Sequence, residues 1–200
     1  MAKKQEKLVH DVIVDHELHG VTPEMIEWWF VNKDKGYPLW HPDDHKSFAW
    51  EIPPSKVGRI GSIELAEEKI GNGPVSVRRI RGADPKEVVN LPAVYEHVAV
   101  TGWPDADGKI RTFLTHQFEA TSYGTRMRSI RHNEEGMPGE AAEAFIKHCK
   151  EEMGRLPDFL PELYKMWKVV TDPKMNVHPI SMEVKKLPDG RWGYTAQSGS

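Results

Sequence analysis

The feature that most constrains this 200-residue chain is a series of strand-like segments with no helical segment between them. The predicted strands span residues 60–68, 74–80, 94–102, 109–121 and 123–132, and a shorter candidate lies at 8–14. Turn signals separate them, such as Asn72-Gly73 and the stretch PDADG. Strands that follow one another through short turns pair antiparallel, so we expect one antiparallel sheet of five or six strands.

Helical periodicity flanks this series. In GVTPEMIEWWFVNK, Thr22 is a suitable N-cap and Pro23 a suitable first residue, which predicts a short helix over residues 23–32. Residues 36–54 contain four prolines and four aromatic residues and are expected to form a structured loop or a short broken strand. A long helix is predicted from Gly139, and Pro157 should break or end it. Its inward stripe is predicted to comprise Ala141, Ala144, Phe145, His148, Glu152 and Leu156.

Strands in series closed by one long helix predict an α+β helix-grip fold. In that fold a curved antiparallel sheet wraps around the C-terminal helix and encloses a cavity, the usual place for a ligand. We expect one domain over residues 1–200. It divides into an N-terminal segment at 1–19, a core at 20–168, and a polar tail or final hairpin at 169–200.

Composition excludes several function classes. The formal net charge is −3, so no overall basic field attracts nucleic acid or acidic membranes. The basic run Arg78, Arg79 and Arg81 is better explained by a solvated strand face than by a phosphate site. Cys149 is the single cysteine, which excludes an internal disulfide and a multi-cysteine metal site. The chain has no apolar stretch of membrane-spanning length, so we expect a cytoplasmic protein by default.

His148 and Glu152 form the most informative pair. They are four residues apart on the predicted long helix, so both side chains leave the same face, as in helices that bind zinc. The alternative is an exposed polar pair. The apolar stripe argues against that alternative, because a buried histidine and glutamate need a partner, which a cation supplies.

The motif WHPDDH places four ligand-type side chains close together, namely His41, Asp43, Asp44 and His45. The alternative is a Pro-Asp turn whose carboxylates cap local backbone amides, and these residues alone favour neither interpretation.

Two further segments carry candidate residues. Strand alternation puts Glu64 and Glu68 on one face and Glu67 on the other, although acidic residues beside a turn are usually solvated. His116 has apolar residues two positions away on either side, which predicts that it points into the cavity. A lone inward histidine is more often a hydrogen-bonded core residue than a catalyst.

At this point the chain resembles a known family. The stretch GVTPEMIEWWFVNKDKGYPLWHPDDH is similar to the signature of the 2,4-diacetylphloroglucinol hydrolase family, which includes phloretin hydrolase. HCKEEMGRLPDFLPELY and THQFEATSYGTRMRS resemble its C-terminal helix and inner strands, so the resemblance touches most of residues 20–164. It implies a helix-grip (Bet v 1/START-like) fold, hydrolysis of a carbon–carbon bond next to an aryl ketone, and one Zn²⁺ bound by two histidines and two glutamates.

The resemblance also implies roles for individual residues. The zinc ligands would be His45, Glu68, His148 and Glu152, with Glu64 or Glu67 as alternatives to Glu68. Beyond the metal, the resemblance implies catalytic roles for Tyr37, as a substrate contact, and for His116, as a proton shuttle that a metal-bound acid such as Glu68 could replace.

The chain departs from the family pattern at two positions. Phe48 stands where the family has an asparagine, and Arg131 stands near a second phenolic contact. We therefore expect diacetylphloroglucinol to be a poor substrate, and expect Phe48, Arg131, Tyr37 and Trp29 to contact a different aryl or cyclic ketone. The expected partner is that small-molecule ketone, with no nucleic acid and no membrane, and a homodimer stays open. The alternatives are a non-catalytic helix-grip binding protein, or a zinc hydrolase for another ketone or an ester.

Overall fold

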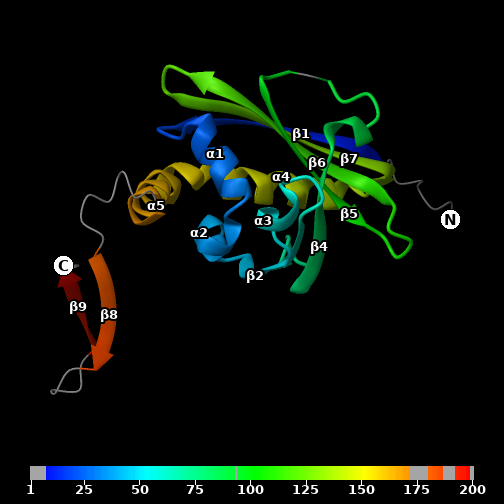
Figure 1. Ribbon diagram of the computed structural model, residues 1–200. Helices are drawn as coiled ribbons and strands as arrows, with labels where there is room; N and C mark the ends of the chain where they lie inside the picture. The colour runs from blue at the N-terminus through cyan, green and yellow to red at the C-terminus, as the bar shows by residue number, and fades with distance from the viewer. Residues whose placement is uncertain (1–7, 93, 172–179, 187–191, 199–200) are drawn as a thin grey trace, which may run out of the picture. The chain divides into compact units, whose positions relative to one another are not determined.

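The computed structural model describes residues 8–92, 94–171, 180–186 and 192–198. Seven strands form one antiparallel sheet in the order β1-β7-β6-β5-β4-β3-β2 (Figure 1). The chain therefore runs as a meander from β2 to β7, and β1 pairs with the last strand of that meander. The strands are β1 (Val9–His19), β2 (His45–Ile52), β3 (Ile63–Glu68), β4 (Ser76–Ala83), β5 (His97–Pro104), β6 (Ile110–Thr121) and β7 (Gly124–Met137).

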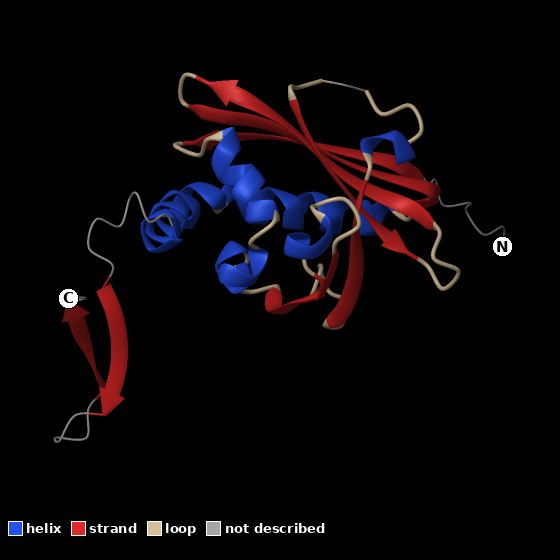
Figure 2. Cartoon of the chain, in the orientation of Figure 1, coloured by secondary structure: helices blue, strands red, loops and turns tan. Residues whose placement is uncertain are grey.

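The helical segments between β1 and β5 are short. Helix α1 (Pro23–Phe30) begins as predicted, since the Thr22 side chain accepts the Met25 N–H and Pro23 occupies the first turn. The others are η1 (Lys33–Lys35), α2 (Tyr37–Trp40), α3 (Pro54–Val57) and η2 (Pro85–Glu87). Figure 2 shows α1, α2 and the long helix α4 (Gly139–Gly154) on the same side of the sheet.

Helix α4 packs on the sheet through β1 and β7. Its buried residues include Phe145, His148 and Glu152, as the predicted stripe requires. Ala141 is an error in that prediction, because it is exposed and Ala142 is buried in its place. The sheet wrapped around α4 confirms the predicted helix-grip class.

Two local predictions can be made more definite. Residues 45–52 form strand β2, whose pairing with β3 is irregular near both ends, so the broken strand is confirmed over the loop. The flanking prolines lie outside the segment that pairs with β3. Helix α4 ends at Gly154 as Pro157 predicts, but a full helix follows it, α5 (Leu156–Thr171). Pro157 is tolerated there because the N–H groups of a first helical turn have no intrahelical partner.

The chain separates into two compact units, residues 1–161 and 162–200. The second contains the antiparallel pair β8 (Ile180–Lys186) and β9 (Trp192–Ser198), in the segment where the sequence predicts a hairpin. Other residues of that tail lie outside the described ranges. No helix in the described part of the chain is both long and apolar enough to cross a membrane.

Candidate metal centre

Four ligand-type side chains converge inside the first unit. His45 opens β2 and Glu68 ends β3, and the two residues stand opposite each other in the ladder. His148 and Glu152 lie one turn apart on α4. The Nε2 atom of His45 is 3.6 Å from an oxygen of Glu68 and 3.6 Å from an oxygen of Glu152. His148 Nε2 is also 3.6 Å from Glu152, and all four residues are buried.

Both histidines are oriented through their other ring nitrogen. His148 Nδ1–H donates to Asp44 Oδ2 at 2.9 Å, and His45 Nδ1–H donates to the backbone carbonyl of Tyr37 at 3.3 Å. These acceptors place the proton on Nδ1 and leave an Nε2 lone pair facing the carboxylates. Nε2 of His45 is buried and has no hydrogen-bond partner among the described residues. Lone pairs that face carboxylates are stabilised by a cation, so the four residues fit a zinc ion.

The electrostatics agree with this geometry. Burial lowers the pKa of His45 to about 3, and burial also lowers the pKa of His148, so both imidazoles are neutral. Burial, followed by the charge of Glu68, raises the pKa of Glu152 well above its usual value. Neutral imidazoles and a carboxylate without sufficient countercharge are the state that a divalent ion stabilises.

A second group of ligand-type residues, the outer group, comprises His41, Asp44 and Glu151. His41 Nδ1 accepts the backbone N–H of Asp44 at 3.2 Å, which leaves Nε2 as the protonated nitrogen. That Nε2–H points toward Glu151 Oε2 at 3.4 Å. Both nitrogens of His41 are thus used within the protein. Its ring stacks on that of His148, with centroids 4.9 Å apart, so it supports the inner group from outside.

The three glutamates of β3 have different partners. Glu64 forms a buried ion pair with Lys33. Glu67 is on the other face and accepts a hydrogen bond from the Ser47 hydroxyl at 2.8 Å. Glu68 alone of the three reaches His45. It also accepts the Tyr37 hydroxyl at 2.9 Å, and Arg78 Nε lies 2.7 Å from its other oxygen, in a poorly aligned ion pair.

A cavity of about 70 Å³ opens beside the four-residue centre. Tyr37 lines it, with its ring stacked on His45 at 4.1 Å between centroids. His116 lines it as predicted and stacks against Phe30 at 5.2 Å. The wall comprises Phe30, Lys33, Tyr37, Trp40, Arg59, Ser62, Glu64, Glu68, Ile70, Ile80, Gly82, Ala99, Thr101, Trp103, Leu114, His116, Phe145, His148 and Glu152.

Three residues predicted to contact substrate do not line this cavity. Trp29 is fully buried between Trp40 and Phe159 in the core. Phe48 is half-buried and contacts Tyr37, at 5.0 Å between ring centroids, on the face of the sheet that carries Glu64 and Glu68.

Arg131, the third of these residues, packs its guanidinium against the rings of Trp103 and Phe145, at 5.2 and 4.8 Å from their centroids. Trp103 and Phe145 themselves belong to the wall. Phe48 and Arg131 therefore contact wall residues without lining the cavity themselves, and their predicted contact with substrate stays a prediction.

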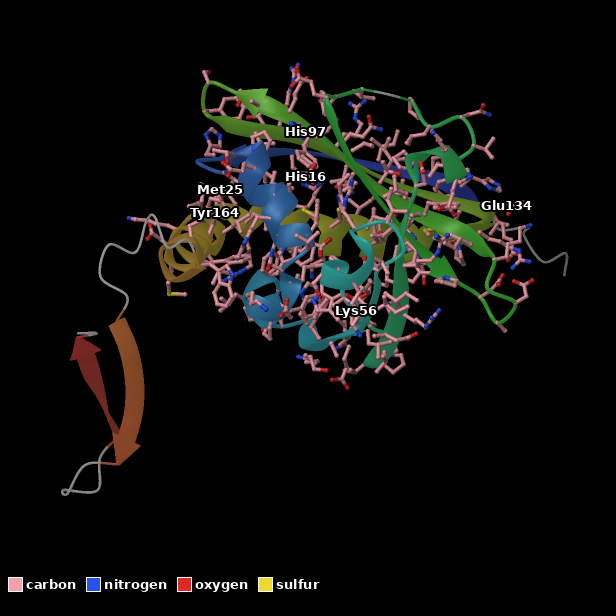
Figure 3. The ribbon with its side chains drawn as sticks, in the orientation of Figure 1. His16, Met25, Lys56, His97, Glu134 and Tyr164 are labelled. Atoms are coloured by element: carbon pink, nitrogen blue, oxygen red, sulfur yellow. The ribbon has the colours of Figure 1, made fainter. Side chains whose placement is uncertain are left out.

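The sequence did not reveal the partners of His116. Its Nδ1 lies 2.8 Å from the Ser129 hydroxyl, and His16 Nε2 lies 3.0 Å from the same oxygen. His16 comes from β1 (Figure 3) and also approaches the Cys149 thiol at 3.8 Å. Strand alternation puts these side chains on inward positions, but only the strand register brings them together. Lys33 and Arg59, the cations of the wall, gave no signal in the sequence.

Comparison with known proteins places the chain in a family. Residues 9–132 match the family described as the DAPG hydrolase PhiG domain. The chain belongs to this family. The matched segment contains His45, Glu68 and His116, whereas His148 and Glu152 lie beyond it. No curated protein matches the chain significantly.

Solved structures confirm the fold. The KanY protein (ms6282) superposes with a TM-score of 0.54 at 10% identity, covering 77% of this chain and 98% of its own. The ginseng major latex-like protein 151 from Panax ginseng also gives 0.54, at 9% identity, covering 77% and 99%. TTHA0849 from Thermus thermophilus gives 0.54 at 11% identity, covering 78% and 98%. These superpositions show a shared helix-grip fold, and at identities this low they show the fold alone.

Proposed function

We propose that this protein is a zinc-dependent hydrolase that cleaves the carbon–carbon bond next to the carbonyl of an aryl or cyclic ketone. Zinc would be held by His45, Glu68, His148 and Glu152. The observation that carries the proposal is the buried Nε2 atom of His45, which faces two carboxylates and has no hydrogen-bond partner among the described residues. Membership of the hydrolase family supports the reaction type.

Zinc in such a centre supplies Lewis acidity toward a ketone oxygen and activates water. Water is then added across the carbon–carbon bond, so that hydroxide goes to the acyl carbon and a proton to the ring carbon. The electron pair of the broken bond stays on the ring carbon. A ring with ortho and para hydroxyl groups accommodates it as a keto tautomer.

His116 is the proton carrier of this proposal. It lies in the cavity wall, and burial together with neighbouring positive charges lowers its pKa to about 3, so the ring is neutral near pH 7. A ring with so low a pKa is a weak base, so in this proposal His116 accepts the proton only as negative charge develops on the bound substrate beside it and raises its pKa. Ser129 holds the ring through Nδ1, which leaves Nε2 for the substrate.

Tyr37 has a positioning role beside the metal ligands. Burial raises the pKa of its hydroxyl, which therefore stays protonated and donates to Glu68 at 2.9 Å. That bond orients a carboxylate oxygen of the centre. The phenolic oxygen retains lone pairs that can accept a hydrogen bond from a ring hydroxyl of the substrate.

The rival is a helix-grip binding protein without catalysis, and product release separates the two. The zinc-loaded protein is incubated with a panel of acylphenols, cyclic ketones and aryl esters, and the carboxylic acid formed is quantified. We expect acid release from at least one ketone, and none with Glu152→Gln, which retains the size of the side chain. Binding of these ketones without acid release would favour the rival, and release from esters alone would change the substrate class.

A further inference from the structure

Arg59 is a positive charge in the cavity wall without a carboxylate partner among the described residues. Its Nη2 atom donates to the backbone carbonyl of Val98 at 2.8 Å, and its Nη1 atom is buried and makes no hydrogen bond. Among the neighbouring cations, Lys33 pairs with Glu64 and Arg78 pairs with Glu68. Arg131 also has a buried Nε without a hydrogen bond, but its guanidinium lies against two aromatic rings and does not line the cavity. A buried guanidinium nitrogen without an acceptor is costly, which indicates that a ligand supplies the acceptor.

The backbone around Arg59 is fixed in place. Gly61 N–H donates to the Gly82 carbonyl at 2.8 Å, and Gly82 N–H donates to the Ser62 carbonyl at 2.9 Å. A Cβ atom at position 82 would lie 2.0 Å from the carbonyl oxygen of Arg59, so only glycine permits this approach. The Arg59 side chain therefore extends from a loop that is anchored to β4. Its guanidinium is held by the Val98 carbonyl and is thus preorganised for binding.

The guanidinium lies away from the metal ligands. It contacts β5 at Val98, next to Ala99, which pairs with His116 on β6. The metal ligands lie on β2, β3 and α4. Glu68 ends β3 and Arg59 lies in the loop that precedes that strand, so the two residues are separated along β3 as well as across the strands. A ligand that reaches both is an elongated ketone with its second polar group at the end far from the carbonyl.

We infer that Arg59 is the receptor for a carboxylate substituent on the ketone, at the end of the cavity opposite the metal ligands. The inference rests on the proposed function, because it takes the ligand to be a ketone held at the centre. The planar fork of arginine matches the two oxygens of a carboxylate. In this inference the arginine that receives the carboxylate is Arg59, whereas the guanidinium of Arg131, which the sequence predicts to contact substrate, packs against two aromatic rings.

The test uses two probes of equal shape, 4-acetylbenzoate and 4-acetylbenzamide, whose binding to the zinc-loaded protein is measured by calorimetry. We expect the benzoate to bind at least about 10-fold more tightly, as for a charge-assisted pair in a buried site. Arg59→Gln keeps a donor for the Val98 carbonyl but removes the charge. It should weaken the benzoate about 10-fold and leave the benzamide unchanged. Arg79→Gln, an exposed arginine paired with Glu51, is the matched control and should keep the preference.

Equal affinities for the two probes in the unaltered protein would overturn the inference, whatever the variants do. So would a preference that Arg59→Gln retains and Glu152→Ala loses, because the carboxylate would then bind the metal. If Arg59→Gln does not fold, Arg59→Met replaces it, because methionine keeps much of the side-chain length without the charge, and an unchanged preference in that variant also contradicts the inference. Binding is measured without turnover. Lack of hydrolysis with an intact preference therefore argues against the proposed function alone.

Discussion

His45 and Glu152 meet at 3.6 Å between Nε2 and Oε2, although one opens a strand and the other lies in the helix that the sheet encloses. The contact joins the edge of the sheet to α4. A cation between these atoms would therefore link the two layers of the fold as well as serve chemistry. The predictions below separate the residues that hold such a cation from those that surround it.

His148→Ala and Glu152→Ala should each abolish tight zinc binding, whereas His41→Ala should retain it. The first two remove ligands that face His45, while both nitrogens of His41 are engaged with Asp44 and Glu151. Zinc content after purification, and titration with a chromophoric chelator, measure the effect. Equal zinc loss in all three variants would show that the outer group takes part in the centre.

Asp44→Asn should weaken zinc binding by about 10- to 100-fold, the usual effect of removing a partner that orients a ligating histidine. Asp44 accepts the Nδ1–H of His148 at 2.9 Å, and asparagine keeps an acceptor oxygen but loses the charge. Asp43→Asn is the control, since Asp43 is exposed and its neighbour makes the contact. Unchanged zinc affinity in Asp44→Asn would mean that the Asp44 carboxylate serves only its own turn and does not orient His148 for metal binding.

Periodicity predicted most of the fold and part of the centre. The interval between His148 and Glu152 places them on one helical face, and strand alternation separates Glu67 from Glu64 and Glu68. Neither pattern shows whether Glu64 or Glu68 is the metal ligand. That choice depends on Lys33, which pairs with Glu64, and on the register that sets Glu68 opposite His45. Register depends on the packing of whole strands, so no local pattern contains it.

The cavity wall was less predictable than the metal ligands. Arg131 lies in a strand whose alternation allows an inward side chain, but two aromatic rings from other elements contact its guanidinium. Arg59 comes from a loop, where no period applies, and reaches the cavity because Gly82 lets that loop approach β4. Contacts between distant segments decide these cases, and one sequence does not encode them in any short spacing.

Lys33→Met should destabilise the protein by roughly 3–5 kcal/mol, the usual effect of breaking a buried ion pair from one side. Both side chains are more than nine-tenths buried, so the variant leaves the Glu64 carboxyl without its countercharge. Burial already raises the pKa of that carboxyl, and losing Lys33 would raise it further. Urea denaturation measures the change. The double variant Lys33→Met with Glu64→Gln should recover a large part of it, and no recovery would mean that Lys33 acts mainly through its packing.

The buried histidines around Ser129 should make stability depend on pH. Burial lowers the pKa of His16 to about 4 and that of His116 to about 3, from about 6.5 in an unfolded chain. Besides Ser129 and Cys149, His16 experiences the charges of Asp15, which raises its pKa, and Lys150, which lowers it. Between pH 6.5 and 4 the unfolded chain thus binds more protons than the folded protein.

Above pH 6.5 both histidines are neutral in the folded and the unfolded chain and do not lower the free energy of unfolding. As the pH falls toward 4, protonation of the unfolded chain lowers that free energy. Each histidine contributes a slope of at most about 1.4 kcal/mol per pH unit. Urea denaturation between pH 4.5 and 7.5, with a chelator present so that zinc release adds nothing, measures it. His16→Asn should flatten the curve in this range, whereas His19→Asn, which changes an exposed histidine, should not. Identical curves for the two variants would mean that His16 is protonated in the folded protein, in conflict with its burial against Ser129.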